Sequence, residues 1–248
     1  MFNEKLFWNK YWQSRIGYFK RSGILFENRF RWGYYCNKAL FRHYKNILGE
    51  IKNKDILEWG AGSGYVSCLA ALEGASVTSI DYASKAVEYM NTVSKVLRVK
   101  SGIKIMKGDL QDIPGENYFD TIWNCGVLEH YSDEEIIRKL KMMIRLTKSN
   151  GIIICTLPNL KSPEGLYRML KNFLMRSERR SERVLGFQHW TSLFQQAGFK
   201  QIKIVPVDLY APSFIPGKLA YLISQIFPLA KKYPGLAWLF SIVGSVGK

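Results

Sequence analysis

Short apolar runs recur through the middle of the chain, and most of them end in a polar residue. The runs lie at residues 56–57, 75–80, 103–107, 118–124 and 152–156. Each run suits a buried β-strand, and helix-start signals lie between several of them. Ser132 with Glu135 is a capping box that predicts a helix through Leu146, and Ser84 is a candidate cap for a helix through about Arg98. The pattern therefore predicts strands and helices in alternation between residues 50 and 160.

The first run leads into three glycines at alternate positions. Residues 56–64 read Ile-Leu-Glu-Trp-Gly-Ala-Gly-Ser-Gly, and helical apolar spacing begins at Val66. Glycine permits a positive φ and lets a ligand approach the backbone closely. The spacing differs from the G-x-G-x-x-G of dinucleotide sites, because Tyr65 stands where that fingerprint has its last glycine. An acid two residues before the first glycine, Glu58, suits a ligand with an ammonium group better than one with a pyrophosphate.

The later runs end in segments of similar character. Asp81 closes the second run, 17 residues after Gly64, where a carboxylate suits the two hydroxyls of a ribose. Gly108-Asp109-Leu110 follows the third run, and Cys125-Gly-Val-Leu-Glu-His130 follows the fourth. Asn150-Gly151 precedes the fifth run.

In this order and at these intervals, the five segments resemble the motifs of the class I S-adenosylmethionine-dependent methyltransferases. The resemblance covers about residues 50–160 and is to the branch that methylates small molecules such as quinone precursors. It implies an α/β, Rossmann-like fold with a seven-stranded, mostly parallel sheet, helices on both faces and an antiparallel last strand. The implied cofactor is S-adenosyl-L-methionine, with S-adenosyl-L-homocysteine as the product and no metal.

The resemblance also implies which residues bind the cofactor. They are Glu58, Gly60, Ala61, Gly62, Gly64, Asp81, Tyr82, Asp109, Leu110, Asn124 and Cys125. Glu58 would hold the methionyl amine through water, with the loop backbone beside it. Asp81 would take the ribose hydroxyls, and Tyr82 would lie against the adenine. Asp109 and Leu110 would read the adenine edge.

The segment after the fourth run bears on the acceptor. Residues 124–127 read Asn-Cys-Gly-Val, without the proline found in enzymes that methylate exocyclic base nitrogens or pyrimidine carbon 5. Cys125 is therefore not expected to be a covalent nucleophile, and its backbone and that of Asn124 would face the methionyl group. This favours a small acceptor, methylated on oxygen first and carbon second.

His130 is the candidate general base, since an imidazole can accept a hydroxyl proton at neutral pH. A structural role at the start of the next helix is the favoured alternative for His130, and His189 is also expected to be structural. The aromatic residues near the N-terminus could close over an apolar substrate or extend the core; they are Trp8, Tyr11, Trp12 and Tyr18.

The sequence thus predicts a methyltransferase that acts on a small or lipid-like acceptor. Two alternatives stay open: an RNA (tRNA) methyltransferase, and a non-catalytic subunit that binds the cofactor. The net charge of +16 suits an anionic partner such as nucleic acid or acidic lipid, or a solvated basic face. The fourth motif makes nucleic acid the less favoured partner, and the oligomeric state is open.

The four cysteines have no C-x-x-C spacing, so neither a zinc site nor a disulfide framework is indicated, and Cys68 and Cys155 are expected in the core. No apolar leader follows Met1, which favours a cytoplasmic protein, with membrane association as an open alternative.

We divide the chain into four parts. Residues 1–49 form a helical, aromatic extension with a helix over 27–48, and residues 50–160 form the cofactor-binding core. Residues 161–188 form an insertion that serves as a lid, and residues 189–248 complete the sheet around an apolar helical insertion. In the last part, a helix closed by Gly198 precedes a strand at 200–207, and 240–248 is the last strand. Neither apolar run, 219–230 nor 236–246, is long enough to span a bilayer, but flanking lysines would suit contact with a membrane surface.

Overall fold

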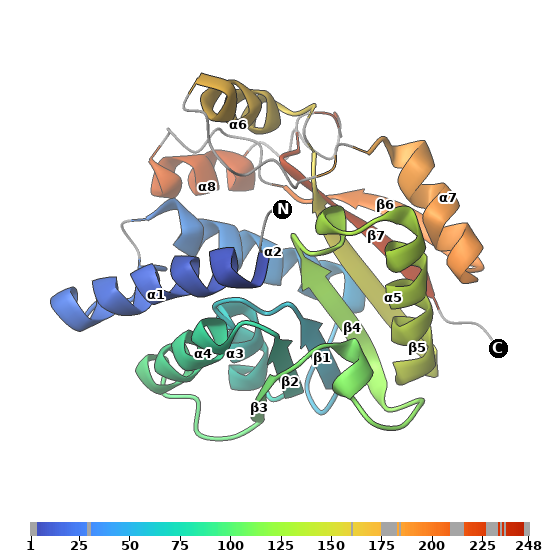
Figure 1. Ribbon diagram of the computed structural model, residues 1–248, viewed down its shortest axis with the longest axis horizontal. Coiled ribbons are helices and arrows are strands. Elements are labelled where there is room, and N and C mark those ends of the chain that lie inside the picture. Colours follow the sequence, from blue (N-terminus) through green and yellow to red (C-terminus); the bar gives the residue numbers. More distant parts are fainter. Residues whose placement is uncertain are drawn as a thin grey trace.

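A single seven-stranded sheet organises the chain (Figure 1). The computed structural model describes residues 4–28, 31–159, 161–174, 183, 185–208, 216–226, 233, 235 and 237–245. The strand order is β3-β2-β1-β4-β5-β7-β6. The strands are β1 (Asp55–Trp59), β2 (Ser76–Asp81), β3 (Ile103–Lys107), β4 (Phe119–Cys125), β5 (Thr147–Pro158), β6 (Gln201–Pro206) and β7 (Leu239–Ser245).

Strands β1 to β5 are parallel, and β7 runs antiparallel between β5 and β6. The predicted fold is therefore confirmed, including the antiparallel last strand. The order reverses between β1 and β4, so their carboxyl ends leave a crevice in which ligands of such sheets bind.

Neighbouring residues of each central strand face opposite layers of helices. Leu57 and Ile122 pack on one side of the sheet, whereas Ile56 and Trp123 pack on the other. All four side chains are fully buried. Because side chains alternate across a strand and both faces are covered, these strands read as continuous apolar runs.

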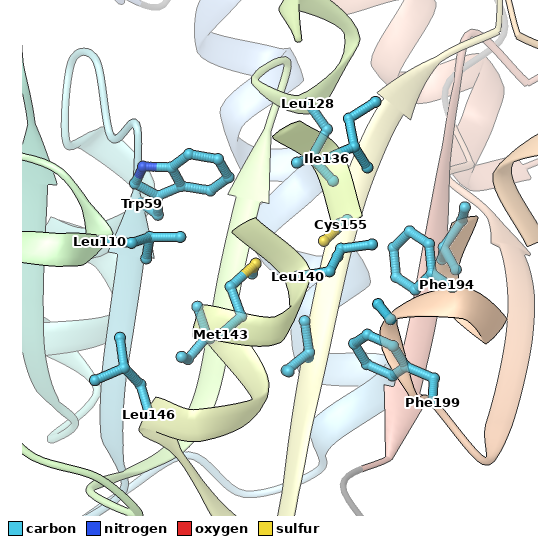
Figure 2. Close-up of a cluster of buried hydrophobic side chains, with 14 of the residues drawn as sticks. Trp59, Leu110, Leu128, Ile136, Leu140, Met143, Leu146, Cys155, Phe194 and Phe199 are labelled. Atoms are coloured by element: carbon cyan, nitrogen blue, oxygen red, sulfur yellow. The ribbon is translucent and has the colours of Figure 1, made fainter. Parts of the chain in front are cut away.

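The first layer contains α5 (Asp133–Leu146), α7 (Phe187–Ala197) and the short 3₁₀ helices η1 (Leu110–Asp112) and η2 (Leu128–His130). Figure 2 shows Leu140 and Met143 of α5 between Leu110 on one side and Phe194 and Phe199 on the other. The capping box of Ser132 and Glu135 opens α5 as predicted. Cys155 lies in this cluster, and Cys68 is equally buried on the opposite side, as expected.

The second layer contains α2 (Trp32–Leu48), α3 (Tyr65–Leu72) and α4 (Ser84–Val96), with α1 (Glu4–Ser22) packed outside α4. The helix predicted over residues 27–48 begins later, because Arg31 has an extended backbone and precedes the first turn of α2. Residues 29–30 of that prediction lie outside the described part of the chain.

The prediction that Ser84 caps α4 is wrong. Ser84 is the first residue of the helix, and Ala83 stands before it with an extended backbone and no side-chain cap. The carboxamide of Asn9, from α1, instead accepts from the Lys85 N–H at 3.1 Å and from the Ser84 hydroxyl at 3.1 Å. The cap comes from another helix, which local spacing cannot reveal.

The insertions contribute α6 (Pro163–Leu174) and α8 (Gly217–Ile226). Helix α7 ends at Gly198, which has φ +106°, as the sequence predicted. Most of the arginine-rich stretch 176–183, and parts of the runs at 219–230 and 236–246, lie outside the described residues. Within the described residues, no helix has both the length and the apolar character needed to cross a membrane.

A chain of buried polar side chains joins α2 to β5 and β7. His43 Nε2 lies 2.9 Å from Ser241 Oγ, which lies 2.7 Å from Thr156 Oγ1. The Tyr44 hydroxyl lies 3.0 Å from Thr156 Oγ1 and donates to the Asn124 carbonyl at 3.2 Å. Burial, with the nearby charge of Arg42, lowers the pKa of His43 to about 4. The imidazole is therefore neutral in the folded chain near neutral pH.

We expect His43 to make folding sensitive to acid. Its folded pKa lies below its unfolded value of about 6.5, so the unfolded chain takes up the proton first and stability falls as the pH drops from about 6.5 towards 4. Between pH 7.5 and 4.5, the wild type should lose about 2.5 kcal/mol more unfolding free energy than His43→Gln. Urea denaturation of both proteins at the two pH values measures the difference. Equal losses would contradict the assignment.

Candidate functional site

A glycine loop connects β1 to α3 at the reversal of strand order. Gly60 and Gly62 have φ of +67° and +55°, in the left-handed region. A Cβ on Gly60 would lie 2.6 Å from Val127, and one on Gly62 would lie 2.7 Å from the Trp12 ring. The loop is fixed to β2, because the Gly60 N–H donates to the Ile80 carbonyl at 2.9 Å. Glycine is thus needed both for the backbone conformation and for the close approach of the neighbouring side chains.

A cavity of about 230 Å³ lies over this loop, at the carboxyl ends of β1, β2 and β4. Helices α1, α2 and α3 and the segment 126–131 after β4 supply its remaining walls. Its described lining consists of Glu4, Trp8, Trp12, Asn37, Leu40, Glu58, Trp59, Gly60, Ala61, Gly62, Ser63, Tyr65, Val66, Asp81, Tyr82, Cys125, Gly126, Val127, His130 and Tyr131.

Glu58, at the end of β1, is a buried carboxylate without a cationic partner in the contacts that hold it. Its Oε2 accepts from the Ser67 N–H at 3.1 Å and from the Ser67 hydroxyl, which in turn accepts from the Ser79 hydroxyl at 2.5 Å. Burial raises the pKa of Glu58 to about 7, although the Ser67 hydrogen bonds oppose the shift. A carboxyl poised in this way would be stabilised as an anion by a ligand that carries positive charge.

Asp81, at the end of β2, is the second buried carboxylate. Its Oδ2 accepts from the Gly62 N–H at 3.0 Å and its Oδ1 from the Ala83 N–H at 2.8 Å. Burial raises the pKa of Asp81, and these two backbone hydrogen bonds oppose the rise. The carboxylate therefore ties the glycine loop to the turn after β2 and still faces the cavity, where its free lone pairs suit the hydroxyls of a ribose.

Two more predicted residues face the cavity. The Tyr82 hydroxyl is buried and has no hydrogen-bond partner among the described residues, so a bound ligand or water would satisfy it. Cys125 ends β4, and burial with the nearby charge of Glu129 raises the pKa of its thiol well above the usual range. A thiol that stays protonated is a poor nucleophile, which agrees with the expected absence of covalent chemistry at Cys125.

The structure brings Glu58, Gly60, Ala61, Gly62, Asp81, Tyr82 and Cys125 together around the cavity, but not the other predicted cofactor residues. Gly64, Asp109, Leu110 and Asn124 lie outside its described lining. Gly64 precedes α3, where an added Cβ would lie 2.8 Å from the Met90 side chain, and Leu110 is fully buried in the core. The binding roles of these residues stay predictions.

Asp109 and Asn124 are engaged elsewhere. The Asp109 carboxylate accepts from the Trp59 indole at 2.8 Å and from the Leu110 N–H at 2.7 Å, and it pairs with Lys139. The Asn124 amide donates to the Cys155 sulfur at 3.3 Å, inside the core. Lys139, a buried cation from α5, belongs to none of the sequence motifs. The sequence therefore could not show that the Asp109 carboxylate already has a partner.

His130, on η2, lines the cavity. Its Nδ1 lies 3.6 Å from the Glu4 carboxylate, and the Trp8 ring meets it edge-on at 5.9 Å. His189 lies elsewhere: its Nε2 is 2.9 Å from the Asp133 carboxylate, at the start of α5, and it is absent from the described lining. This contact is compatible with the structural role expected for His189, which stays a prediction.

Helix α1 closes one side of the cavity, which sequence spacing did not reveal. Trp8 and Trp12 line the cavity, whereas Tyr11 and Tyr18 do not. Trp12 lies between the glycine loop and Tyr89, on which it stacks at 5.7 Å. In the sequence, this wall was indicated only by the density of aromatic residues in the segment and by Tyr65, which stands where the dinucleotide fingerprint has its last glycine.

The sheet order, the glycine loop and the acids at the ends of β1 and β2 all agree with the fold of the class I methyltransferases. Residues 57–155 match the family model described as methyltransferase domain. This match, over about two fifths of the chain, and the methyltransferase names of the relatives below support an S-adenosylmethionine-dependent methyltransferase.

Its curated relatives have different acceptors. The ubiquinone biosynthesis O-methyltransferase of Nitrosomonas europaea is 28% identical over 54% of this chain and 56% of its own length. The alpha N-terminal protein methyltransferase 1 of Schizosaccharomyces pombe is 26% identical, over 66% and 74%. The tRNA U34 carboxymethyltransferase of Ruthia magnifica is 26% identical, over 63% and 49%. The chain thus spans about half the length of the first and third of these.

Solved structures share the fold. The possible histamine N-methyltransferase of Thermotoga maritima has a TM-score of 0.60 and 19% identity, over 86% of this chain and 89% of that one. The magnesium protoporphyrin IX methyltransferase of Synechocystis PCC 6803, solved with bound S-adenosylhomocysteine, has a TM-score of 0.56 and 15% identity, over 85% and 81%.

If Glu58 receives the methionyl amine, binding of S-adenosylmethionine should release a proton. The raised pKa leaves most Glu58 carboxyls protonated at pH 6.0, and the ammonium would favour the anion. Calorimetry in buffers of different ionisation enthalpy should show release of close to one proton at pH 6.0 (about 0.9) and little at pH 8.5. Glu58→Gln should bind more weakly and without proton release. The same release from that variant would contradict the assignment.

Asp81→Ala should weaken cofactor binding by about 1 kcal/mol or more, because the ribose hydroxyls would lose a charge-assisted partner. Glu88→Ala is the matched control, since Glu88 is an exposed acid on α4 that pairs with Lys85. Titration with S-adenosylhomocysteine measures both affinities. Wild-type affinity in Asp81→Ala would remove the ribose assignment.

Proposed function

We propose that the chain transfers a methyl group from S-adenosylmethionine to an oxygen, or less favourably a carbon, of a small or lipid-like acceptor. One observation carries the proposal: the described lining of the cavity is rich in aromatic side chains and contains no lysine or arginine, in a chain of net charge +16. A cavity of this kind suits an apolar, uncharged acceptor better than a phosphorylated one.

The residues around the cavity fit the cofactor. Glu58 and Asp81 offer buried carboxylates to an ammonium and to a pair of hydroxyls, and the glycine loop leaves its backbone open to close approach. When bound, the sulfonium supplies an already activated methyl group. The task of the protein is then to hold the acceptor atom in line with that methyl group and to exclude water, with Trp8 and Trp12 as one wall.

His130 is the proposed acceptor of the hydroxyl proton. Its ring lines the cavity, and Nδ1 faces the Glu4 carboxylate at 3.6 Å. A carboxylate beside one ring nitrogen favours the imidazolium that forms when the other nitrogen accepts a proton.

An RNA acceptor is the second candidate. The net charge and the similarity to a tRNA U34 carboxymethyltransferase favour it. The carboxylates of Glu4, Glu58 and Asp81 oppose it, because they line the cavity without a lysine or arginine in the described lining. The non-catalytic alternative has no support among the relatives, whose names are those of methyltransferases.

Methyl-labelled S-adenosylmethionine distinguishes the candidates. The protein is incubated with quinols, with a polar lipid extract, with bulk tRNA or with a peptide that has a free α-amine. Label that passes into the organic phase with quinols or lipids, in an alkali-stable linkage, is the expected result. Label found only in tRNA or in the peptide would overturn the proposed acceptor class without questioning the cofactor.

His130→Ala should slow methyl transfer to the identified acceptor by about 100-fold, as expected for loss of a general base, and leave cofactor affinity unchanged. His189→Ala is the matched control, because His189 pairs with Asp133 away from the cavity. Single-turnover rates across pH measure the effect. An unchanged rate in His130→Ala would assign His130 a structural role.

A further inference from the structure

Helices α6 and α8 lie at the end of the molecule to which the parallel strands point (Figure 1). The cavity lies at the same end, since it is built on the carboxyl ends of β1, β2 and β4. Both helices carry large aliphatic side chains that are about half exposed or more: Leu166, Leu170, Leu219, Leu222 and Ile226, at 57%, 59%, 50%, 45% and 67%.

Helix α8 has one inner and one outer face. Tyr221 faces α2, with its ring 5.5 Å from that of Tyr35 and 5.2 Å from the Arg42 guanidinium. The exposed residues of α8 follow at intervals of three and four positions from Leu219, so they share the face opposite Tyr221. The helix is held by its aromatic side and presents its aliphatic side outward.

Helix α6 has the same organisation. It begins just after β5, where the Ser162 hydroxyl accepts from the Gly165 N–H at 3.1 Å. Asn159 ties this start to the segment before β7 by donating to the Ala237 carbonyl at 2.9 Å. Leu166 and Leu170 are one turn apart on the exposed face, whereas Glu164 is fully buried.

The charge around these faces has one sign. Glu164 is the only acid of the two helices, and it is buried. Lys161 precedes α6, and Lys218 stands next to Leu219 in the first turn of α8. On these two helices, exposed aliphatic residues lie beside lysines and no carboxylate is exposed. Such a face suits a bilayer surface, which has anionic headgroups outside and apolar acyl chains beneath them.

We propose that the exposed faces of α6 and α8 dock on an anionic lipid membrane and hold the mouth of the cavity at its surface. The aliphatic side chains enter the boundary between headgroups and acyl chains, and the lysines meet the anionic headgroups. A lipid-like acceptor would then reach the cavity without crossing bulk water. That last step rests on the proposed function, whereas the docking itself does not.

Flotation with vesicles tests the docking. The full chain is mixed with vesicles of phosphatidylcholine, with or without phosphatidylglycerol, and spun through a density gradient. The wild type should float with the vesicles that contain phosphatidylglycerol, and less so at high salt. Leu166→Glu/Leu170→Glu and Leu219→Glu/Leu222→Glu should each reduce binding by about tenfold or more.

Leu72→Glu and Val96→Glu are the matched controls. Both residues are exposed aliphatics, at 52% and 44%, and they end α3 and α4 at the opposite end of the sheet. The controls should float like the wild type. Circular dichroism and titration with S-adenosylhomocysteine confirm that each variant is folded with an intact cofactor site.

Three results would overturn the docking. The first is no flotation with either vesicle, and the second is an equal loss of vesicle binding in the control variants. The third is a dimer, seen by light scattering, that does not float and that the same leucine substitutions dissociate. The last result would assign these faces to a second copy of the chain. Cofactor titration keeps the two proposals apart. A chain that floats but does not bind S-adenosylhomocysteine contradicts the proposed function alone, and a chain that binds it without floating contradicts the docking alone.

Discussion

The burial of two carboxylates at neighbouring strand ends is the constraint on which the rest of the site depends. Glu58 and Asp81 lie at the ends of β1 and β2 and are held by hydroxyl and backbone N–H donors, and the described lining around them contains no lysine or arginine. Burying such groups costs free energy unless hydrogen bonds or a positive ligand compensate. The glycine loop supplies part of that compensation through the Gly62 N–H, and a cationic cofactor would supply more. The site is therefore arranged for a ligand that carries both an ammonium group and hydroxyls.

Helix α1 converts this crevice into a cavity. Asn9 caps α4, and Trp12 lies against Gly62 and stacks on Tyr89, so the helix is fixed to the same elements that form the cofactor site. The same helix brings Glu4 to His130. An N-terminal helix outside the sheet thus contributes both a wall and a charged group to the site. The binding of cofactor and acceptor therefore depends on how this one helix packs.

The sequence was sufficient for the sheet and for the part of the site that lies on local motifs. The strand runs, the glycine loop and the acids at 58 and 81 are close in sequence to the elements they serve, so spacing alone locates them. It could not supply contacts made across the fold. The pairing of Asp109 with Lys139 and Trp59, the cap that Asn9 provides in place of Ser84, and the wall formed by Trp8 and Trp12 each join segments far apart in sequence. For the same reason, the roles predicted for Asp109 and Leu110 at the adenine stay predictions.

Calorimetric titration of the wild-type chain measures whether this cavity binds S-adenosylmethionine. We expect saturable binding of S-adenosylmethionine and S-adenosylhomocysteine and no binding of NADH, because the loop lacks the last glycine of the dinucleotide fingerprint and places an acid where a pyrophosphate would lie. Binding of NADH, or no binding of either sulfur ligand, would contradict this expectation.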